Sequence, residues 1–431
     1  MSTAFALCLG VFLTLAAIGV PVGFAMMAAA VGYLFAAGQD PGLVAEQVLN
    51  GLFDSFVLLA VPLFILAANF MNAGTVSDRL LSFCLALVGR FKGGLAQVNV
   101  LASLIFSGMS GSAIADAAGI GKVITEMMSV KGRYPPGFAA ALTAASSTIG
   151  PIIPPSIPMV LYALVSDTSI GYLFLGGVIP GLSMAAVLMI LNWLVARRRS
   201  FPSEDGVALA RLPGLTLSAL PALMLPVILL AGIYGGATTP TEAAAVAAAY
   251  ALVLAAFFYR ALSFGEFFAI VVRSARATAV VGIIIAGALI FNYIVASENI
   301  PARVASTIDA WDLSPVVFLL TVNLIFLALG CLFDATTLLL VAVPIFLPAV
   351  RALGIDPVHF GVVIVINIML GLITPPYGVV LFVLNGVTGI PLRKMFKEIW
   401  PFVLVLALAL LVLALNPGAA LWLPRQFGYL G

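Results

Sequence analysis

The sequence contains few charged residues. Only 8% of its 431 residues are Asp, Glu, Lys or Arg, whereas 63% are hydrophobic. A water-soluble domain of this length could not cover its surface with so few charges. A membrane span needs about 20 apolar residues, so the length allows roughly ten spans. The chain is therefore predicted to be an all-α polytopic membrane protein embedded in a lipid bilayer.

Histidine and cysteine are also scarce, which excludes several kinds of active site. His359 is the single histidine, so neither a histidine metal cluster nor a Ser-His-Asp triad can form without it. The cysteines at 8, 84 and 331 lie far apart in apolar sequence and are expected to be small buried residues. The net charge of +2 argues against a nucleic-acid partner. We predict no transition-metal site and no enzymatic activity.

Proline interrupts two of the apolar runs. Residues 147–162, STIGPIIPPSIPMVLY, contain Gly150 and four prolines, and residues 371–382, GLITPPYGVVLF, repeat the pattern. Because proline lacks a backbone donor and clashes with the preceding turn, a helix cannot continue through either stretch unbroken. Within lipid, a broken helix survives only inside protein or around an aqueous cavity. Two broken helices in corresponding halves of a chain indicate the ion and substrate site of a transporter.

These breaks belong to an internal repeat. Pro154-Pro155 precedes Pro375-Pro376 by 221 residues, and both halves show a span pair, an arm, a span, an arm, a hairpin, a broken span and a final span. Five spans in each half make the two halves insert in opposite senses, so the repeat is inverted. The predicted units are residues 1–199, with a re-entrant helical hairpin at about 97–130 and a broken helix at about 137–165; a polar linker at 200–213; and residues 214–431, with a hairpin at about 315–350 and a broken helix at about 357–384.

Basic residues set the orientation. Cytoplasmic loops are enriched in Lys and Arg, so Arg197–Arg199 are placed inside. Counting spans then also places Arg273 and Arg276 inside, on an arm at residues 261–273 and just after it. The first 20 residues lack a basic region and are expected to be the first span. Both termini are therefore predicted to lie outside the cytoplasm.

Small and hydroxyl residues gather at the hairpin tips and helix breaks. Freed carbonyls and hydroxyls suit a hard cation such as Na⁺, and half-helix N-termini suit a carboxylate. The alternative is that these residues serve packing and kinks only. The first predicted Na⁺ cluster is Ser110, Gly111, Ser112, Ser147 and Gly150, and the second is Asp334, Thr336, Thr337, Gly371 and Thr374.

Two carboxylates lie in the hairpins. A charged Asp at a helix centre costs about 2.5–3.5 kcal/mol on insertion scales, so Asp116 is expected to face the bundle interior or to be protonated. It would support the site by hydrogen bonding or bind the ion directly. Asp334 lies nearer its tip, and direct ligation is left open for it as well. Asn69, Asn292 and Asn367 are membrane residues that could bond across helices.

The motifs together resemble those of a known family. They include SGSAIADAAGIG at 110–121, STIGPIIPPSIPMVLYA at 147–163, GGATTPTEAAA at 235–245, DATTLLLVAVPIFLP at 334–348 and GLITPPYG at 371–378. With PVGFAM at 21–26 and VPLFILAANFM at 61–71, they extend over nearly the whole chain. The chain resembles the large membrane subunit of a tripartite ATP-independent periplasmic (TRAP) transporter.

The resemblance implies a Na⁺-coupled importer of organic acids in the bacterial inner membrane. Such a subunit works with a small four-helix membrane subunit and a periplasmic substrate-binding protein. The related fold implies an elevator, in which hairpins and broken helices move against a scaffold. A self-sufficient ion-coupled anion transporter or antiporter of related fold is the alternative.

The resemblance also implies a substrate position between the two hairpin tips. The Pro154-Pro155 break is expected to face the Ser110–Ser112 tip, and Pro375-Pro376 the tip near Asp334. The residues predicted to contact the carboxylate substrate are Ser112, Asp116, Pro154, Pro155, Thr337, Pro375 and Pro376.

Overall fold

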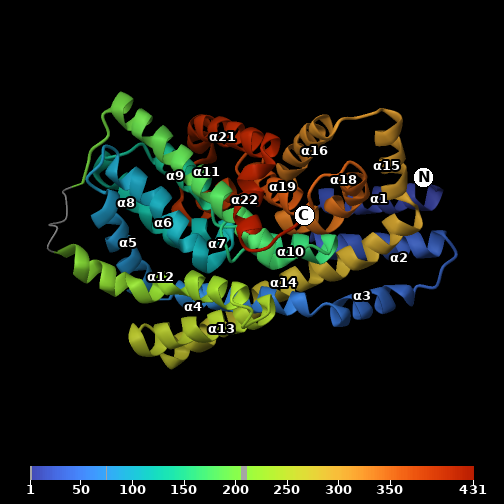
Figure 1. The fold of residues 1–431 in the computed structure, drawn as a ribbon, viewed down its shortest axis with the longest axis horizontal. Coiled ribbons are helices and arrows are strands. Elements are labelled where there is room, and N and C mark those ends of the chain that lie inside the picture. The colour runs from blue at the N-terminus through green and yellow to red at the C-terminus, as the bar shows by residue number, and fades with distance from the viewer. Residues whose placement is uncertain (1, 74, 205–210) are drawn as a thin grey trace.

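All regular structure in the described part of the chain is helical (Figure 1). The computed structural model describes residues 2–73, 75–204 and 211–431. Within these ranges, six helices are long and apolar enough to cross a membrane, and one bent pair would add a seventh. Shorter apolar helices make up much of the remainder. The prediction of an all-α polytopic membrane protein is confirmed.

The first half begins with two helices and two arms around α4. It continues with a hairpin, a broken helix and the long helix α11. Its helices are α1 (Thr3–Ala17), α2 (Val22–Ala36), α3 (Leu43–Asp54), α4 (Ala60–Met71), α5 (Thr75–Val88), α6 (Gly94–Ser110), α7 (Ala113–Asp116), α8 (Lys122–Ser129), α9 (Pro136–Ser147), α10 (Ile157–Ser166) and α11 (Ile170–Arg199).

The second half repeats most of this order. A short helix, α22, follows its last long helix and was not foreseen from the sequence. Its helices are α12 (Leu212–Tyr234), α13 (Pro240–Val253), α14 (Phe264–Ser297), α15 (Ile300–Ala310), α16 (Pro315–Gly330), α17 (Ala335–Thr337), α18 (Val343–Ala352), α19 (Pro357–Gly371), α20 (Val379–Thr388), α21 (Leu392–Leu415) and α22 (Pro417–Gln426).

Element positions in the two halves differ by a nearly constant offset. Helices α6 and α16 begin at 94 and 315, α9 and α19 at 136 and 357, and α11 and α21 at 170 and 392, so each pair is 221 or 222 residues apart. Each hairpin also contains a π-helical turn, at Ala117–Gly121 and Leu338–Ala342, again 221 apart. These offsets agree with the spacing of the two proline pairs. The boundaries of the two predicted units remain a prediction.

Of the predicted linker, residues 205–210 lie outside the described part of the chain. Residues 201–204 are non-helical, and the Glu204 amide donates to the Gly89 carbonyl at 3.0 Å. The Glu204 carboxylate also pairs with Arg133 at 2.7 Å. This end of the linker is therefore held against the turn between α5 and α6.

Helix α14 corrects one boundary. The sequence predicts an arm at 261–273 and a separate span at 277–296, but a single helix of 34 residues covers both. Nothing between Phe264 and Ser297 breaks a helix, because the stretch contains no proline. Ser263 and Glu266 form a capping box that fixes its start. In the first half the corresponding elements, α3 and α4, are bent at a break between them.

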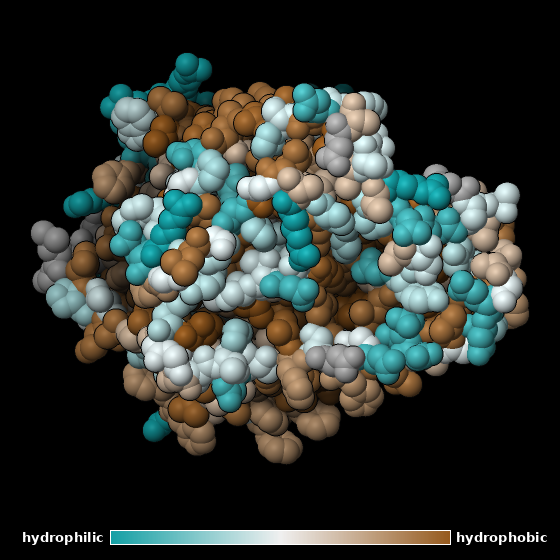
Figure 2. Space-filling view, turned by 45° about the vertical axis from the view of Figure 1, so that its right-hand side comes forward, coloured by the Kyte–Doolittle hydropathy of each residue, from teal (hydrophilic) through white to brown (hydrophobic). Residues whose placement is uncertain are grey.

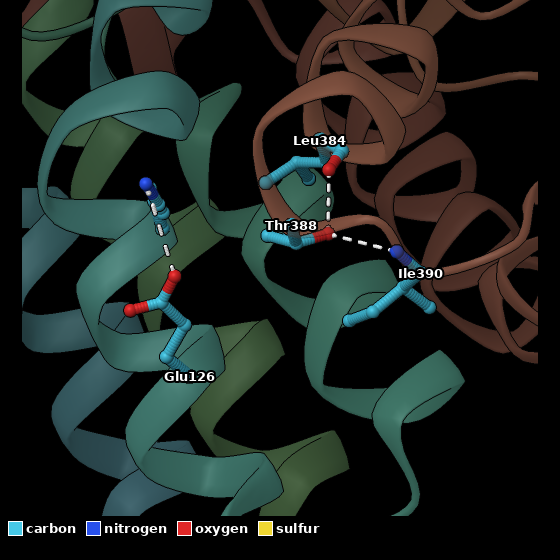
Figure 3. A network of polar contacts seen from close by, with 5 residues as sticks. Glu126, Leu384, Thr388 and Ile390 are labelled. Atoms are coloured by element: carbon cyan, nitrogen blue, oxygen red, sulfur yellow. Dashed lines mark hydrogen bonds and ion pairs between the residues drawn. The ribbon is translucent and has the colours of Figure 1, made fainter.

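The two halves interlock at the centre of the molecule. Helices α9 and α19 are buried almost throughout. The first hairpin packs against α9 and also against α20 of the other half, and the second hairpin packs against α19 and also against α10. Figure 3 shows α8, which carries Glu126 in its 3.9 Å pair with Lys122, beside the end of α20, where the Thr388 hydroxyl donates to the Leu384 carbonyl at 2.5 Å. Each broken helix is therefore shared between two hairpins.

Several of the remaining helices lie in one layer on one side of the hairpins and broken helices (Figure 1). In Figure 1, α3, α4, α12, α13 and α14 lie along the lower side, below the hairpins and broken helices. Hydrophobic side chains gather on the lower edge in Figure 2 as well. Exposed apolar residues on this layer include Leu217 at 70% and Phe257 at 75%. Side chains of this kind are expected to face lipid or a membrane partner.

Candidate functional site

Both predicted helix breaks are present. Helix α9 ends at Ser147, and α10 begins ten residues later at Ile157. The Ser156 hydroxyl caps α10 by accepting from the Met159 amide at 3.2 Å. Helix α19 ends at Gly371, and α20 begins after Gly378, whose φ of 58° lies in the left-handed region. Each break contains a cis peptide bond between its paired prolines. The first break is buried almost throughout, whereas Pro376 and Tyr377 of the second break are exposed.

The first hairpin tip lies against the first break. Helix α6 ends at Ser110, Gly111 has φ of 58°, and Ser112 caps α7 by accepting from the Ala115 amide at 3.4 Å. A Cβ atom on Gly111 would overlap the carbonyl oxygen of Pro155. Only glycine combines this φ with so close an approach. The expected contact between the tip and the Pro154-Pro155 break is therefore present.

Asp116 lies at the centre of the first cluster. It is 2% exposed, and its Oδ1 accepts a hydrogen bond from the Ser110 hydroxyl. Its Oδ2 is buried without a hydrogen-bond partner among the described residues, and a Cβ on Gly150 would overlap that oxygen. Ser147 is also buried, but its hydroxyl already donates to the Thr143 carbonyl at 2.6 Å. Ser110 and Gly150, which lie in different parts of the fold, therefore both contact the Asp116 carboxylate.

In the second cluster, Asp334 is a helix cap. Its Oδ2 accepts from the amides of Thr336 at 2.9 Å and Thr337 at 3.2 Å, and its Oδ1 accepts from the Thr337 hydroxyl at 2.5 Å. This capping role was missed in the sequence analysis, although Asp before a helix start is its usual signal. Whether Asp334 also binds an ion remains a prediction. The Thr374 hydroxyl donates to the Leu370 carbonyl at 2.7 Å.

The second hairpin meets its broken helix through two glycines. A Cβ on Gly371 would lie 2.7 Å from both Cα and C of Gly330. This contact is four residues before Pro375, which is half-buried, while Pro376 is exposed. The second tip therefore approaches the end of α19, and the expected approach of the proline pair to the tip near Asp334 remains a prediction.

One cavity joins the two predicted clusters. Its volume is about 390 Å³, and it lies between both hairpin tips on one side and helices α4 and α14 on the other. Its lining includes Ser110, Gly111 and Ser112 from the first tip, Asp334, Ala335 and Thr336 from the second, Asn69 from α4 and Arg273 from α14. Both hairpin tips therefore line the same cavity.

Few of the residues predicted to contact substrate line this cavity. Ser112 does so, whereas the others do not. Asp116 lies behind Ser110, and Thr337 is a buried residue one position past the lining residue Thr336. The residues outside the lining are Asp116, Pro154, Pro155, Thr337, Pro375 and Pro376. Of these, Asp116, Pro155 and Thr337 contact the lining residues Ser110, Gly111 and Asp334, respectively.

Three asparagines bond across helices, as expected. Asn69 Nδ2 donates to the Ser274 hydroxyl at 2.9 Å, and Asn292 Nδ2 donates to the Leu340 carbonyl at 2.8 Å. Asn367 Nδ2 donates to Asn323 Oδ1 at 2.7 Å. These bonds join α4 to α14, α14 to the second hairpin, and α19 to α16. Buried polar groups need such partners in a membrane protein.

The donor set fits a hard cation. Hydroxyls, carboxylates and main-chain carbonyls are ligands that suit Na⁺, Mg²⁺ or Ca²⁺ rather than a soft metal. In the described ranges, no three His, Cys, Asp or Glu residues gather closely enough to hold a metal ion. His359 is buried, and its Nε2 lies 3.1 Å from the Leu413 carbonyl. The single histidine therefore contacts backbone in the protein interior.

The comparisons with known proteins decide the family. The family model "Tripartite ATP-independent periplasmic transporter, DctM component" matches residues 9–419. The chain belongs to this family. It is 40% identical over 414 residues to the sialic acid TRAP transporter large permease protein SiaM of Vibrio cholerae, covering 95% of this chain and 96% of that protein. It is 40% identical over 375 residues to the C4-dicarboxylate TRAP transporter large permease protein DctM of Pseudomonas aeruginosa, covering 87% and 88%.

A solved structure shares the fold. The YdaH transporter of Alcanivorax borkumensis matches with a TM-score of 0.62, covering 86% of this chain and 87% of that one. The sequence identity is only 16%, so the match concerns the fold alone. The chain is therefore a multi-pass TRAP large permease with the fold of a known transporter.

Proposed function

We propose that this TRAP large permease carries an organic acid into the cell together with Na⁺. The observation that supports this most is the cavity that joins both hairpin tips, because it combines hydroxyls, a carboxylate and one guanidinium in an otherwise apolar wall. The relatives named above are a sialic acid and a C4-dicarboxylate permease. Both names describe acids that carry carboxylates, which fits a site containing a cationic side chain.

The proposed mechanism is an elevator. The two hairpins and two broken helices would move together, because they interlock at the centre of the molecule. Helices α4 and α14, which close the other side of the cavity, would belong to the static scaffold. A substrate between these two groups would be carried across the membrane by sliding one against the other. The chain would work in the bacterial inner membrane, with both termini in the periplasm.

Two Na⁺ sites are proposed at the tips. The first comprises Ser110, Gly111, Ser112, Ser147 and Gly150, and the second Asp334, Thr336, Thr337, Gly371 and Thr374. Each net positive charge that enters down 100 mV supplies about 2.3 kcal/mol, which can drive uptake without ATP. The proposed partners are a small four-helix membrane subunit and a periplasmic binding protein that delivers the acid.

Uptake is expected to need Na⁺ and both partner chains. The complex would be reconstituted in vesicles with the small subunit and binding protein, and uptake of labelled N-acetylneuraminate and succinate would be measured with Na⁺ or choline outside. We expect at least a fivefold lower initial rate in choline for whichever acid is transported. Equal uptake in choline with no other ion gradient would contradict the proposal. Transport by the large subunit alone would favour the self-sufficient alternative.

Asp334 offers a test of the second Na⁺ site. Asp334→Asn keeps a side-chain oxygen for the capping amides but removes the charge, so folding should change little while apparent Na⁺ affinity falls several-fold. Asp334→Ala should also lower the free energy of unfolding by about 1 kcal/mol, because the cap is lost. The measurement is the Na⁺-dependent rise in the melting temperature of the purified chain.

Asp356 is a matched control for this test. Its Oδ1 caps α19 in the same way, accepting from the amides of Val358 at 2.8 Å and His359 at 3.1 Å, but Asp356 does not line the cavity. Asp356→Asn should therefore leave Na⁺ affinity unchanged. If Asp334→Asn also keeps the wild-type Na⁺ affinity, Asp334 acts only as a helix cap.

A further inference from the structure

The cavity contains one cationic side chain. Among its lining residues, Arg273 of α14 is the only Lys or Arg, and Asp334 is the only Asp or Glu. The apolar part of the wall is extensive and includes Ile65, Leu161 and Met369. A carboxylate entering such a space loses water, so a single well-placed cation decides where it can bind. Arg273 is the side chain that meets this requirement.

The rotation of α14 determines which side of the helix Arg273 occupies. Arg273, Ala277 and Val281 are spaced four residues apart and all line the cavity, so one face of α14 forms this wall. The next residue, Ser274, is buried and accepts a hydrogen bond from Asn69 of α4 at 2.9 Å. This bond and the packing of α14 on α4 fix the rotation of the helix beside the cavity.

Arg273 has no anionic partner among the described residues. The ion pairs there are Lys122–Glu126, Arg133–Glu204 and Arg199–Glu398. Asp334 shares the cavity, but its two oxygens already accept from Thr336 and Thr337. The planar N–H donors of the guanidinium are therefore available, and their geometry allows two parallel hydrogen bonds to one carboxylate.

We propose that Arg273 binds the carboxylate of the transported acid in this cavity. The proposal rests on the proposed function, since it assumes that an organic acid occupies the cavity. In this proposal the two sides of the cavity have different roles. The hairpin tips provide hydroxyls and the cation sites, and α14 provides the anion-binding group. If the tips slide along α14 during transport, the contact exists in only one conformation. Arg273 then sets the affinity for the acid on one side of the membrane.

The test compares two arginines on the same helix. Arg273→Gln removes the cation from the cavity, and Arg273→Lys keeps the charge but not the planar donors. Arg276→Gln is the matched control, because Arg276 lies three residues further on and is exposed like Arg273, but it does not line the cavity. Binding of N-acetylneuraminate, succinate and their methyl esters would be measured on the purified chain in phosphatidylcholine nanodiscs. The absence of anionic lipid keeps a lipid headgroup from competing for Arg273.

We expect Arg273→Gln to weaken binding of the preferred acid roughly 10- to 100-fold, as for loss of a hydrogen-bonded ion pair. The acid affinity of Arg273→Lys should lie between the affinities of wild type and Arg273→Gln, and the acid affinity of Arg276→Gln should stay within twofold of wild type. The methyl ester should bind the wild-type chain as weakly as the acid binds Arg273→Gln. All variants should keep the Na⁺-dependent rise in melting temperature, which shows that they fold. Unchanged acid affinity in Arg273→Gln, with the Na⁺ response intact, would overturn the assignment of Arg273 alone. A wild-type chain that responds to neither Na⁺ nor any acid would overturn the proposed function, and this inference with it.

Discussion

Replacing Gly371 with alanine is expected to reduce Na⁺-driven uptake to background. A Cβ atom at this position would lie 2.7 Å from Cα and C of Gly330, and both are backbone atoms that cannot rotate away. Helix α19 and helix α16 must then move apart where they end, beside the second proposed Na⁺ site. Inserting a methyl group into such a contact costs about 1–3 kcal/mol of folding stability. Uptake in vesicles and the melting temperature of the purified chain would measure the two effects.

Gly386 provides the control for this substitution. It lies inside α20, in the same broken helix, and a Cβ there would meet nothing within 4 Å. Alanine is favoured over glycine inside a helix by about 0.5–1 kcal/mol, so Gly386→Ala should keep uptake and leave the melting temperature equal or slightly higher. Wild-type uptake by Gly371→Ala would show that the Gly330–Gly371 contact has no role in transport.

Much of this fold follows from local features of the sequence. Proline pairs in apolar runs predict breaks wherever they occur, because the loss of a backbone donor does not depend on the tertiary fold. Both breaks are found where they were expected, at 148–156 and 372–378. The boundary at Arg273 was predicted wrongly, because polar residues were taken to end an arm. Charged and small residues such as Arg276 and Ala277 continue a helix readily, so polarity alone does not break it.

The interlock of the halves could not be predicted in the same way. Each hairpin packs against a broken helix of the other half, and these contacts join residues more than 160 positions apart. No local sequence pattern indicates such a pairing. Helix α20 ends beside α8 at Thr388, followed by Gly389 with φ of 70°, but the residues at this helix end do not indicate which helix lies next to it (Figure 3).

The sequence predicts the site residues at the two hairpin tips, but not the residue that α14 contributes to the cavity lining. Hydroxyls and glycines at the tips were recognisable because they interrupt apolar sequence, and Ser110, Ser112, Asp334 and Thr336 do line one cavity. Arg273 was missed as a site residue because an arginine at the end of an arm is typical of a cytoplasmic loop. Its position beside the tips depends on how α14 crosses α4, which the Asn69–Ser274 bond fixes only in the folded chain.

Asp116→Asn is expected to weaken the response to Na⁺ while the protein remains folded. The substitution keeps the size of the side chain and an oxygen that accepts from the Ser110 hydroxyl, but it removes a buried negative charge. Oδ2 of Asp116 lacks a partner among the described residues and lies against Gly150, within the first proposed Na⁺ cluster. A cation beside it would gain one charged ligand, so its loss should weaken apparent Na⁺ affinity on the order of tenfold or more.

Stability without Na⁺ separates this role from a structural one. An unpaired buried carboxylate costs folding free energy, so Asp116→Asn should melt at the same temperature as wild type or higher when Na⁺ is absent, and a given Na⁺ concentration should stabilise it less than wild type. Asp167→Asn is the control: Asp167 is exposed at the end of α10, with φ of 55° that asparagine tolerates, and should change neither property. If Asp116→Asn instead keeps the Na⁺ response and uptake, the carboxylate serves only as a hydrogen-bond acceptor for Ser110. The first Na⁺ site would then consist of hydroxyls and main-chain carbonyls alone.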